Sequence, residues 1–80
     1  MTGSYEFKIQ SRREDIDFIN KIIEAYEEVG IVRTTDPKNA VLTIISTSDY
    51  KDIVREIILD LDKNYVEAKI IEEGLWSGVL

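Results

Sequence analysis

Carboxylates are the side chains of this 80-residue sequence whose type and spacing could do chemistry. They gather at three places, which are Glu14, Asp15 and Asp17, then Asp49 and Asp52, and then Asp60 and Asp62. Oxygen ligands of this kind are what Mg²⁺ and Ca²⁺ prefer. However, the spacing of a calcium-binding EF-hand loop, with its central glycine, is missing. Side chains two positions apart on a helix also diverge, so Asp15 and Asp17 cannot chelate one ion together. We therefore expect no metal site.

The residue types give no support to nucleophilic catalysis. The chain has no cysteine and no histidine, so the usual pair of nucleophile and base cannot be assembled. The same absences remove the commonest zinc and copper ligands. Ser46, Thr47 and Ser48 are interpreted as loop and helix-capping residues. We expect a protein that is not an enzyme and has no cofactor.

Cationic side chains lie near two expected turns. Arg12 and Arg13 follow the first expected strand, where the first amides of a helix can bind an anion. Arg33, Asp36 and Lys38 lie on the hairpin that comes next. One interpretation is a small-ligand site made of these five residues. The alternative is structural, because no glycine near the arginines lets the backbone wrap a phosphate and the Asp-Pro pair is typical of a turn.

The overall charge limits the classes of partner. The formal net charge is −6 and the pI is about 4.5. Nucleic-acid binding draws on clustered lysine and arginine, and an anionic membrane surface attracts basic segments. No apolar run approaches the roughly 20 residues that cross a bilayer, and the N-terminus lacks the pattern of a signal peptide. We expect a cytoplasmic protein whose partner is neither nucleic acid nor membrane.

The chain length favours self-association. A lone core of this size supplies only about 3–5 kcal/mol of stability. Disulfides, one usual supplement, are excluded by composition, and the commonest ligands for a structural metal are missing. We expect a homo-oligomer, most simply a dimer, or a complex with another protein.

The hydrophobic pattern predicts four strands, at residues 4–10, 31–35, 40–46 and 66–72, with one helix after the first strand and one after the third. In the first strand, Tyr5, Phe7 and Ile9 alternate with polar residues. An Asp-Pro-Lys-Asn turn at 36–39 joins the second and third strands. The strand–helix–strand–strand–helix–strand order predicts one α+β domain of ferredoxin-like βαββαβ type, residues 1–80, with antiparallel strand order 4-1-3-2 and both helices on one face.

Both helices carry recognisable end signals and apolar stripes. Ser11 and Glu14 have the spacing of a capping box, and Gly30 is expected to end the first helix. Residues 47–49 offer N-caps to the second helix, and Asn64 offers a C-cap. The residues expected to face the core from the helices are Ile16, Ile19, Ile22, Ile23, Tyr26 and Val29, and then Ile53, Val54, Ile57, Ile58 and Leu61.

A two-layer fold leaves one face of its sheet without helices. The third and fourth strands are expected to place aliphatic side chains there, and residues 73–80 form an apolar tail that could cover this face or that of a partner subunit. The residues expected at such an interface are Val41, Thr43, Ile45, Ile71, Leu75, Trp76, Val79 and Leu80.

About half of the chain resembles a family of small bacterial domains of unknown function. The matching positions are Asp15, Ile16 and Phe18, then Glu24, Tyr26 and Glu27, and then Val32, Arg33, Thr34, Asp36, Pro37 and Lys38. The resemblance implies no activity. The topology is also similar to ACT-type regulatory domains, and that resemblance implies small-ligand binding at a subunit interface. We therefore expect a non-enzymatic protein-association or regulatory module that acts as a homodimer, with an ACT-like ligand or anion sensor as the alternative.

Overall fold

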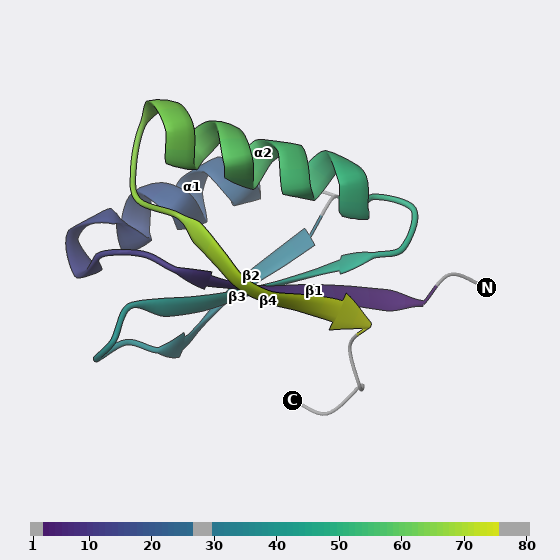
Figure 1. The fold of residues 1–80 in the computed structure, drawn as a ribbon, viewed down its shortest axis with the longest axis horizontal. Helices are drawn as coiled ribbons and strands as arrows, with labels where there is room; N and C mark the ends of the chain where they lie inside the picture. The colour runs from purple at the N-terminus through teal and green to yellow at the C-terminus, as the bar shows by residue number, and fades with distance from the viewer. Residues whose placement is uncertain (1–2, 27–29, 76–80) are drawn as a thin grey trace.

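The fold is an α+β sandwich with one four-stranded sheet, seen in a computed structural model that describes residues 3–26 and 30–75. The sheet order is β2-β3-β1-β4, every neighbouring pair is antiparallel, and both helices cover the same face (Figure 1). The elements are β1 (Ser4–Gln10), the 3₁₀ helix η1 (Arg13–Asp15), α1 (Ile16–Ala25), β2 (Gly30–Asp36), β3 (Val41–Thr47), α2 (Lys51–Asn64) and β4 (Lys69–Leu75). The predicted ferredoxin-like topology and strand order are confirmed.

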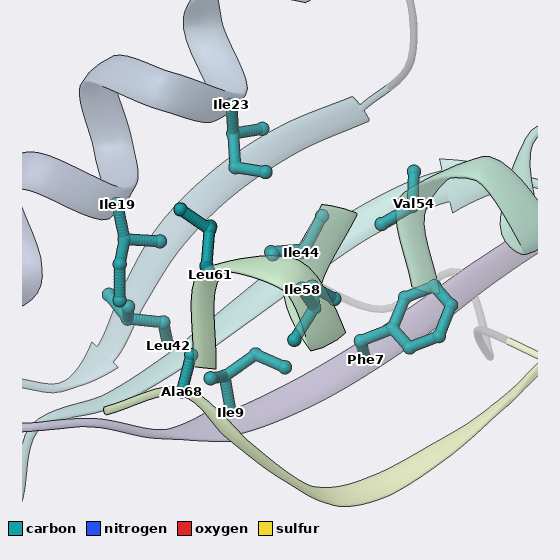
Figure 2. Close-up of a cluster of buried hydrophobic side chains, with 10 residues drawn as sticks. All are labelled: Phe7, Ile9, Ile19, Ile23, Leu42, Ile44, Val54, Ile58, Leu61 and Ala68. Carbon is teal, nitrogen blue, oxygen red and sulfur yellow. The ribbon is translucent and has the colours of Figure 1, made fainter. Parts of the chain in front are cut away.

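The core lies between the sheet and the helices. In β1, Phe7 and Ile9 are fully buried and stand opposite Ile44 and Leu42 of β3. Cross-strand partners lie on the same face of the sheet, so Phe7 and Ile9 identify the face that the helices cover, as the alternation in the first strand predicts. Figure 2 shows the buried cluster, which consists of Phe7, Ile9, Ile19, Ile23, Leu42, Ile44, Val54, Ile58, Leu61 and Ala68.

The hairpin between β2 and β3 has the predicted turn. The Asp36 carboxylate accepts hydrogen bonds from the Asn39 amide nitrogen at 3.1 Å and from Asn39 Nδ2 at 2.8 Å. Ala40 follows in the left-handed region, with φ of 57°. Its carbonyl accepts the Ser11 amide at 2.9 Å, which places the start of η1 beside this hairpin.

The predicted capping box at Ser11 is wrong. The Ser11 amide donates to Ala40 and is not available to Glu14, and the buried Ser11 hydroxyl has no hydrogen-bond partner. The chain instead makes the 3₁₀ turn of η1, in which the Asp15 amide donates to the Arg12 carbonyl at 2.9 Å. The turn before β3 therefore takes the donor that the capping box needs.

Gly30 is the first residue of β2 rather than the end of a helix, because α1 ends at Ala25. A Cβ atom at position 30 would lie 3.0 Å from the Ile45 carbonyl oxygen. The glycine is thus explained by close approach of β2 to β3.

The second helix also lacks the predicted side-chain caps. Its N-cap is Tyr50, without a side-chain hydrogen bond, and Tyr65 follows its last residue, Asn64. The Ser48 hydroxyl donates to the Gly3 carbonyl at 3.1 Å, so it holds the residue before β1 and does not cap α2. Of the helices in the described ranges, none combines the length and apolarity that crossing a bilayer requires.

The fourth strand begins later than predicted. The Ala68 amide donates to Asp62 Oδ1 at 2.9 Å, which fixes the connection after α2, and strand pairing starts at Lys69. Glu73 and Leu75, expected in the tail, belong to β4, where Leu75 stands opposite Tyr5. Residues 76–80 lie outside the described residues, and with them the predicted covering roles of Trp76, Val79 and Leu80. Val29, expected on the first helix, lies outside them as well.

Candidate functional site

The face of the sheet opposite the helices, here called the open face, carries aliphatic side chains from three strands. Ile31 of β2 stands opposite Ile45 of β3, and Val41 and Thr43 share the same side of β3 because the alternate residues of this strand are in the core. Ile71 follows the core-facing Ile70 in β4. Ile31 and Ile71 are 60% and 56% exposed among the described residues, whereas Val41 and Ile45 are half-buried, so the two edges of this face are its exposed apolar parts.

Charges of both signs stand among these aliphatic residues. Glu6 and Lys8 of β1 are opposite Ile45 and Thr43, and Arg33 of β2 is also opposite Thr43. Glu72 of β4 is opposite Lys8, and its carboxylate lies 3.9 Å from Lys8 Nζ. Away from its ends, the open face therefore holds two acids and two bases. Thr43, at its centre, is already buried by its neighbours.

The five residues of the predicted ligand site lie at the start of η1 and on the β2–β3 hairpin. Arg12 forms an ion pair with Asp15 at 3.0 Å and lies at the start of η1, whereas Arg33 faces the open side of the sheet. Asp36 is occupied by the turn. Among residues 3–26 and 30–75, no hydrogen bond or ion pair joins Arg12 or Arg13 to the charged residues of the hairpin.

A polar hollow of about 440 Å³ lies between the start of η1 and the connection from α2 to β4. Arg12, Lys63 and Lys69 line it together with Asp62 and Glu67. The Lys69 ammonium lies 2.7 Å from Asp62 Oδ2, and this contact lowers the pKa of Asp62 and raises that of Lys69. Arg12 and Lys69 are thus already neutralised by carboxylates.

A second surface, here called the interhelical groove, runs between α1 and α2. Phe18, Ile22 and Tyr26 line it from the first helix, and Ile53, Ile57 and Tyr65 line it from the second. The Phe18 and Tyr65 ring centroids are 6.3 Å apart across it. The groove has a volume of about 400 Å³. Its aromatic lining remains 40–66% exposed, so it is a shallow channel rather than an enclosed cavity.

Sequence reasoning missed this groove because it assigned Tyr26 and Ile53 to the core. They are 49% and 47% exposed. The available signal was the width of each apolar stripe, which covers more of the helix surface than a sheet below can bury. The groove also has an acidic side, formed by Glu56 and Asp60 on successive turns of α2. Asp60 accepts a hydrogen bond from Asn64 Nδ2 at 2.7 Å. Because the Asn64 side chain is neutral, this bond does not compensate the negative charge of Asp60.

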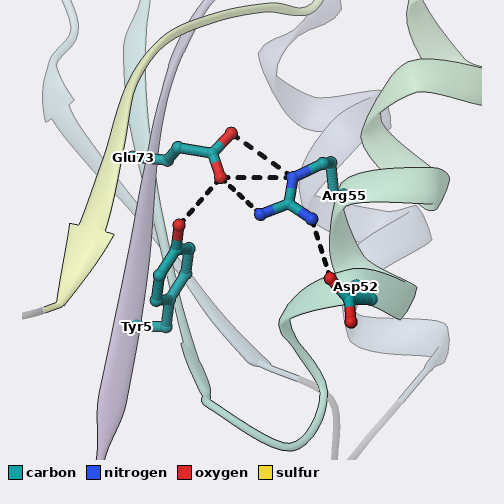
Figure 3. Close-up of polar contacts among 4 residues, drawn as sticks. All are labelled: Tyr5, Asp52, Arg55 and Glu73. Carbon is teal, nitrogen blue, oxygen red and sulfur yellow. Dashed lines mark hydrogen bonds and ion pairs between the residues drawn. The ribbon is translucent and has the colours of Figure 1, made fainter.

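The polar cluster in Figure 3 links the edge strand β4 to α2. Arg55 Nη2 lies 2.5 Å from Glu73 Oε1, and Arg55 Nη1 lies 2.8 Å from Asp52 Oδ1. The Tyr5 hydroxyl donates to Glu73 Oε1 at 2.8 Å. The Arg55 guanidinium also lies over the Phe7 ring, with 5.7 Å between Cζ and the ring centroid. This cluster therefore ties three elements together above the core.

The cluster moves the pKa values of its acids in opposite directions. Hydrogen bonds from Arg55 lower the pKa of Glu73, and the hydrogen bond to Glu73 raises the pKa of Tyr5. The carboxylate stays charged and the phenol stays protonated near neutral pH. A pair of this kind does not exchange protons there, because general acid–base catalysis needs a pKa near the working pH.

In the described ranges, no three acidic side chains gather closely enough to hold a metal ion.

Comparison with known proteins identifies a family. The family model described as a domain of unknown function (DUF4911) matches residues 9–64, which is more than half of the chain. This span runs from the end of β1 to the end of α2. No curated protein and no solved structure matches the chain. The chain therefore belongs to the DUF4911 family.

Proposed function

We propose that this protein is a non-enzymatic association module that forms a homodimer through the open face of its sheet. The observation that carries the proposal is the aliphatic surface on which Ile31 and Ile71 are exposed and Val41 and Ile45 are half-buried. An apolar patch on a small domain is usually an interaction site, since leaving it in water costs free energy that contact with a partner recovers.

The charges on the open face favour a second copy of the chain as the partner. The whole chain carries a formal charge of −6, so two copies repel each other over most of their surfaces. The open face differs because Glu6 and Glu72 are balanced by Lys8 and Arg33. In a two-fold symmetric contact the same patch meets itself, and a patch with both signs can pair each acid with a base.

The size of the face indicates a weak dimer. Four strands of seven residues cover a surface of about 20 by 23 Å at ordinary strand spacings. This is smaller than the roughly 800 Å² per partner of a standard stable interface. We expect a reversible dimer with a Kd on the order of micromolar.

A regulatory role fits a dimer whose assembly depends on concentration. The Arg55 cluster is assigned a structural part in this proposal, because the lowered pKa of Glu73 and the raised pKa of Tyr5 do not suit general acid–base catalysis near neutral pH. The cytoplasmic location stays a prediction from the sequence.

An ACT-like sensor of small anions is the second candidate. The polar hollow favours it, since Arg12, Lys63 and Lys69 all line the space beside the first helix turn. It ranks second because Asp15 and Asp62 already pair with two of these three cations. Titration with inorganic phosphate, monitored by thermal unfolding and amide shifts, tests it, and the absence of any shift at Lys63 and Lys69 removes it.

Sedimentation equilibrium of the full chain and of Ile31→Lys tests the homodimer. Ile31 is exposed on an edge strand, so the substitution leaves the fold intact while placing a desolvated charge in the proposed interface. We expect a monomer–dimer equilibrium for the wild type. For Ile31→Lys we expect at least about a tenfold higher Kd, which corresponds to about 1.4 kcal/mol.

Leu59→Lys is the matched control. Leu59 is 54% exposed on α2 and lines neither the open face nor the interhelical groove. A wild-type chain that remains monomeric at high concentration would contradict the proposal. An equal loss of dimer in Ile31→Lys and Leu59→Lys would contradict it as well, because it would show a general charge effect.

A further inference from the structure

The interhelical groove lies on the opposite side of the molecule from the proposed dimer interface. Both helices lie on one side of the sheet (Figure 1), and the residues that line the groove come from these two helices and the residues that follow them. A dimer formed through the open face therefore leaves two grooves accessible. The groove joins aromatic and aliphatic side chains of both helices, led by Phe18, Tyr26 and Ile53. It consequently needs an occupant of its own.

A small molecule does not fit the shape of the groove. Ligand pockets usually bury most of their ligand, about 70–90% of its surface. Here Tyr65 is 66% exposed and Tyr26 is 49% exposed, so a small ligand would remain largely in water. A channel between two helices with apolar walls instead has the shape that accepts a third helix, which inserts apolar side chains at helical spacing.

The charge of the groove selects among helical partners. Glu56 and Asp60 stand beside the apolar lining, and no ion pair with a cation involves either of them within the described part of the chain. A second copy of this chain would bring the same carboxylates face to face, and like charges meeting at an interface disfavour it. A helix with lysine or arginine beside its apolar stripe would pair with them instead.

We propose that the interhelical groove is a docking site for a basic amphipathic helix of another protein. Its apolar stripe packs on Ile53 and Ile57, beside the contacting rings of Phe18 and Tyr65 of this chain. Its cationic side chains reach the carboxylates of Glu56 and Asp60. The acidic rim disfavours acidic helices and anionic membrane surfaces by repulsion, so charge determines specificity while apolar contact supplies affinity.

Amide-shift titration of the full-length protein with three synthetic peptides tests the docking site. The first is a helical peptide of about 18 residues with leucine at helical spacing and lysine elsewhere on its surface. The second has glutamate in place of every lysine, and the third is a scrambled form of the first. We expect the first peptide to shift amides of α1 and α2 around the groove and to bind at least about tenfold more tightly than either of the others. The difference from the acidic peptide shrinks as salt is added.

Two variants assign the binding to the groove. Ile53→Lys places a charge on the apolar lining of the groove and should lower the affinity for the basic peptide at least about tenfold. The double variant Glu56→Lys with Asp60→Lys should reverse the preference, so that the acidic peptide binds more tightly than the basic one. A gain of binding of this kind cannot result from misfolding. Leu59→Lys, on the same helix but outside the groove, should bind like the wild type.

Three results would overturn the docking site. The first is equal affinity for the basic and scrambled peptides. The second is a set of amide shifts confined to elements other than α1 and α2. The third is a double variant that keeps the preference for the basic peptide, since charge at Glu56 and Asp60 would then play no part in recognition.

Discussion

The open face of the sheet and the interhelical groove are both apolar surfaces of one small domain, yet their charges differ. On the open face, Lys8 and Arg33 balance two glutamates. In the groove, Glu56 and Asp60 stand without a basic residue among the lining side chains of residues 3–26 and 30–75. Exposed apolar area alone would assign both surfaces the same role. The arrangement of charges separates them, because one surface can meet a copy of itself and the other cannot.

The two surfaces also differ in how firmly their residues are held. Those of the open face stand on strands whose register is fixed by cross-strand pairing. Those of the groove include Tyr26 and Tyr65, which follow the last residues of α1 and α2. Helix ends tend to fray, so we expect the groove to adapt to a partner more readily than the sheet does.

The largest expected effect is a loss of stability, and it should differ between two neighbouring residues of β3 whose side chains point to opposite sides of the sheet. Ile44→Ala empties a fully buried position and should lower the free energy of unfolding by about 3 kcal/mol. Ile45→Ala lies on the open face and should lower it by about 1 kcal/mol or less in the monomer. Urea unfolding at a concentration below the dimer Kd measures both values. Equal losses would contradict the assignment of Ile45 to the half-buried open face and of Ile44 to the core.

The next largest effects are losses of binding affinity, and they test whether the open face and the interhelical groove act independently. Ile31→Lys should weaken dimerisation at least about tenfold and leave the affinity for the basic peptide unchanged. Ile53→Lys should weaken peptide binding by a similar factor and leave the dimer unchanged. Sedimentation equilibrium and peptide titration of both variants provide the four measurements. A variant that impairs both activities would show that the surfaces are coupled or that the fold has been lost.

The smallest effect concerns two adjacent glutamates of β4, one on each side of the sheet. Glu73→Gln removes the charge that accepts hydrogen bonds from Arg55, and should lower the Tm by about 4 °C at neutral pH. Glu72→Gln removes only an exposed contact of 3.9 Å with Lys8, and should lower it by about 1 °C or less. Thermal unfolding by circular dichroism compares them.

The sign of the pH dependence follows from the lowered pKa of Glu73. A carboxyl group with a lower pKa in the folded state than in the unfolded chain stabilises the fold above its ordinary value of 4.5. That stabilisation is lost as the pH falls through the folded value. Asp62 acts in the same direction through Lys69. The Tm difference between wild type and Glu73→Gln should therefore shrink as the pH falls below 4.5, and a difference that is independent of pH would contradict this explanation.

Local patterns predicted the parts of this fold that depend on local interactions. Phe7 and Ile9 alternate with polar residues along β1, and this pattern correctly predicted which side of β1 faces the core. The hydrogen bonds between Asp36 and Asn39 confirm the predicted turn. The predicted cap at Ser11 failed because Ala40, far along the chain, takes its amide. A local motif cannot reveal that a distant turn will compete for the same donor.

The groove and the Arg55 cluster required knowledge of how distant elements pack. Tyr26 and Ile53 have the spacing of core residues, and only the space available between two helices and a sheet decides that they remain outside. The contact between Arg55 and Glu73 depends on the register shift between β1 and β4, which places Glu73 opposite Phe7. No residue pattern in the sequence predicts this shift. The open face was predictable, because it requires only the topology and the alternation of β3.

The central claim is that the homodimer forms through the open face, and intermolecular nuclear Overhauser effects test it most directly. A mixed sample of isotope-labelled and unlabelled full-length protein, well above the dimer Kd, reports only contacts between copies. We predict contacts among the methyl groups of Ile31, Val41 and Ile45. Contacts confined to Ile53 and Ile57, or no contact between copies at all, would contradict the claim.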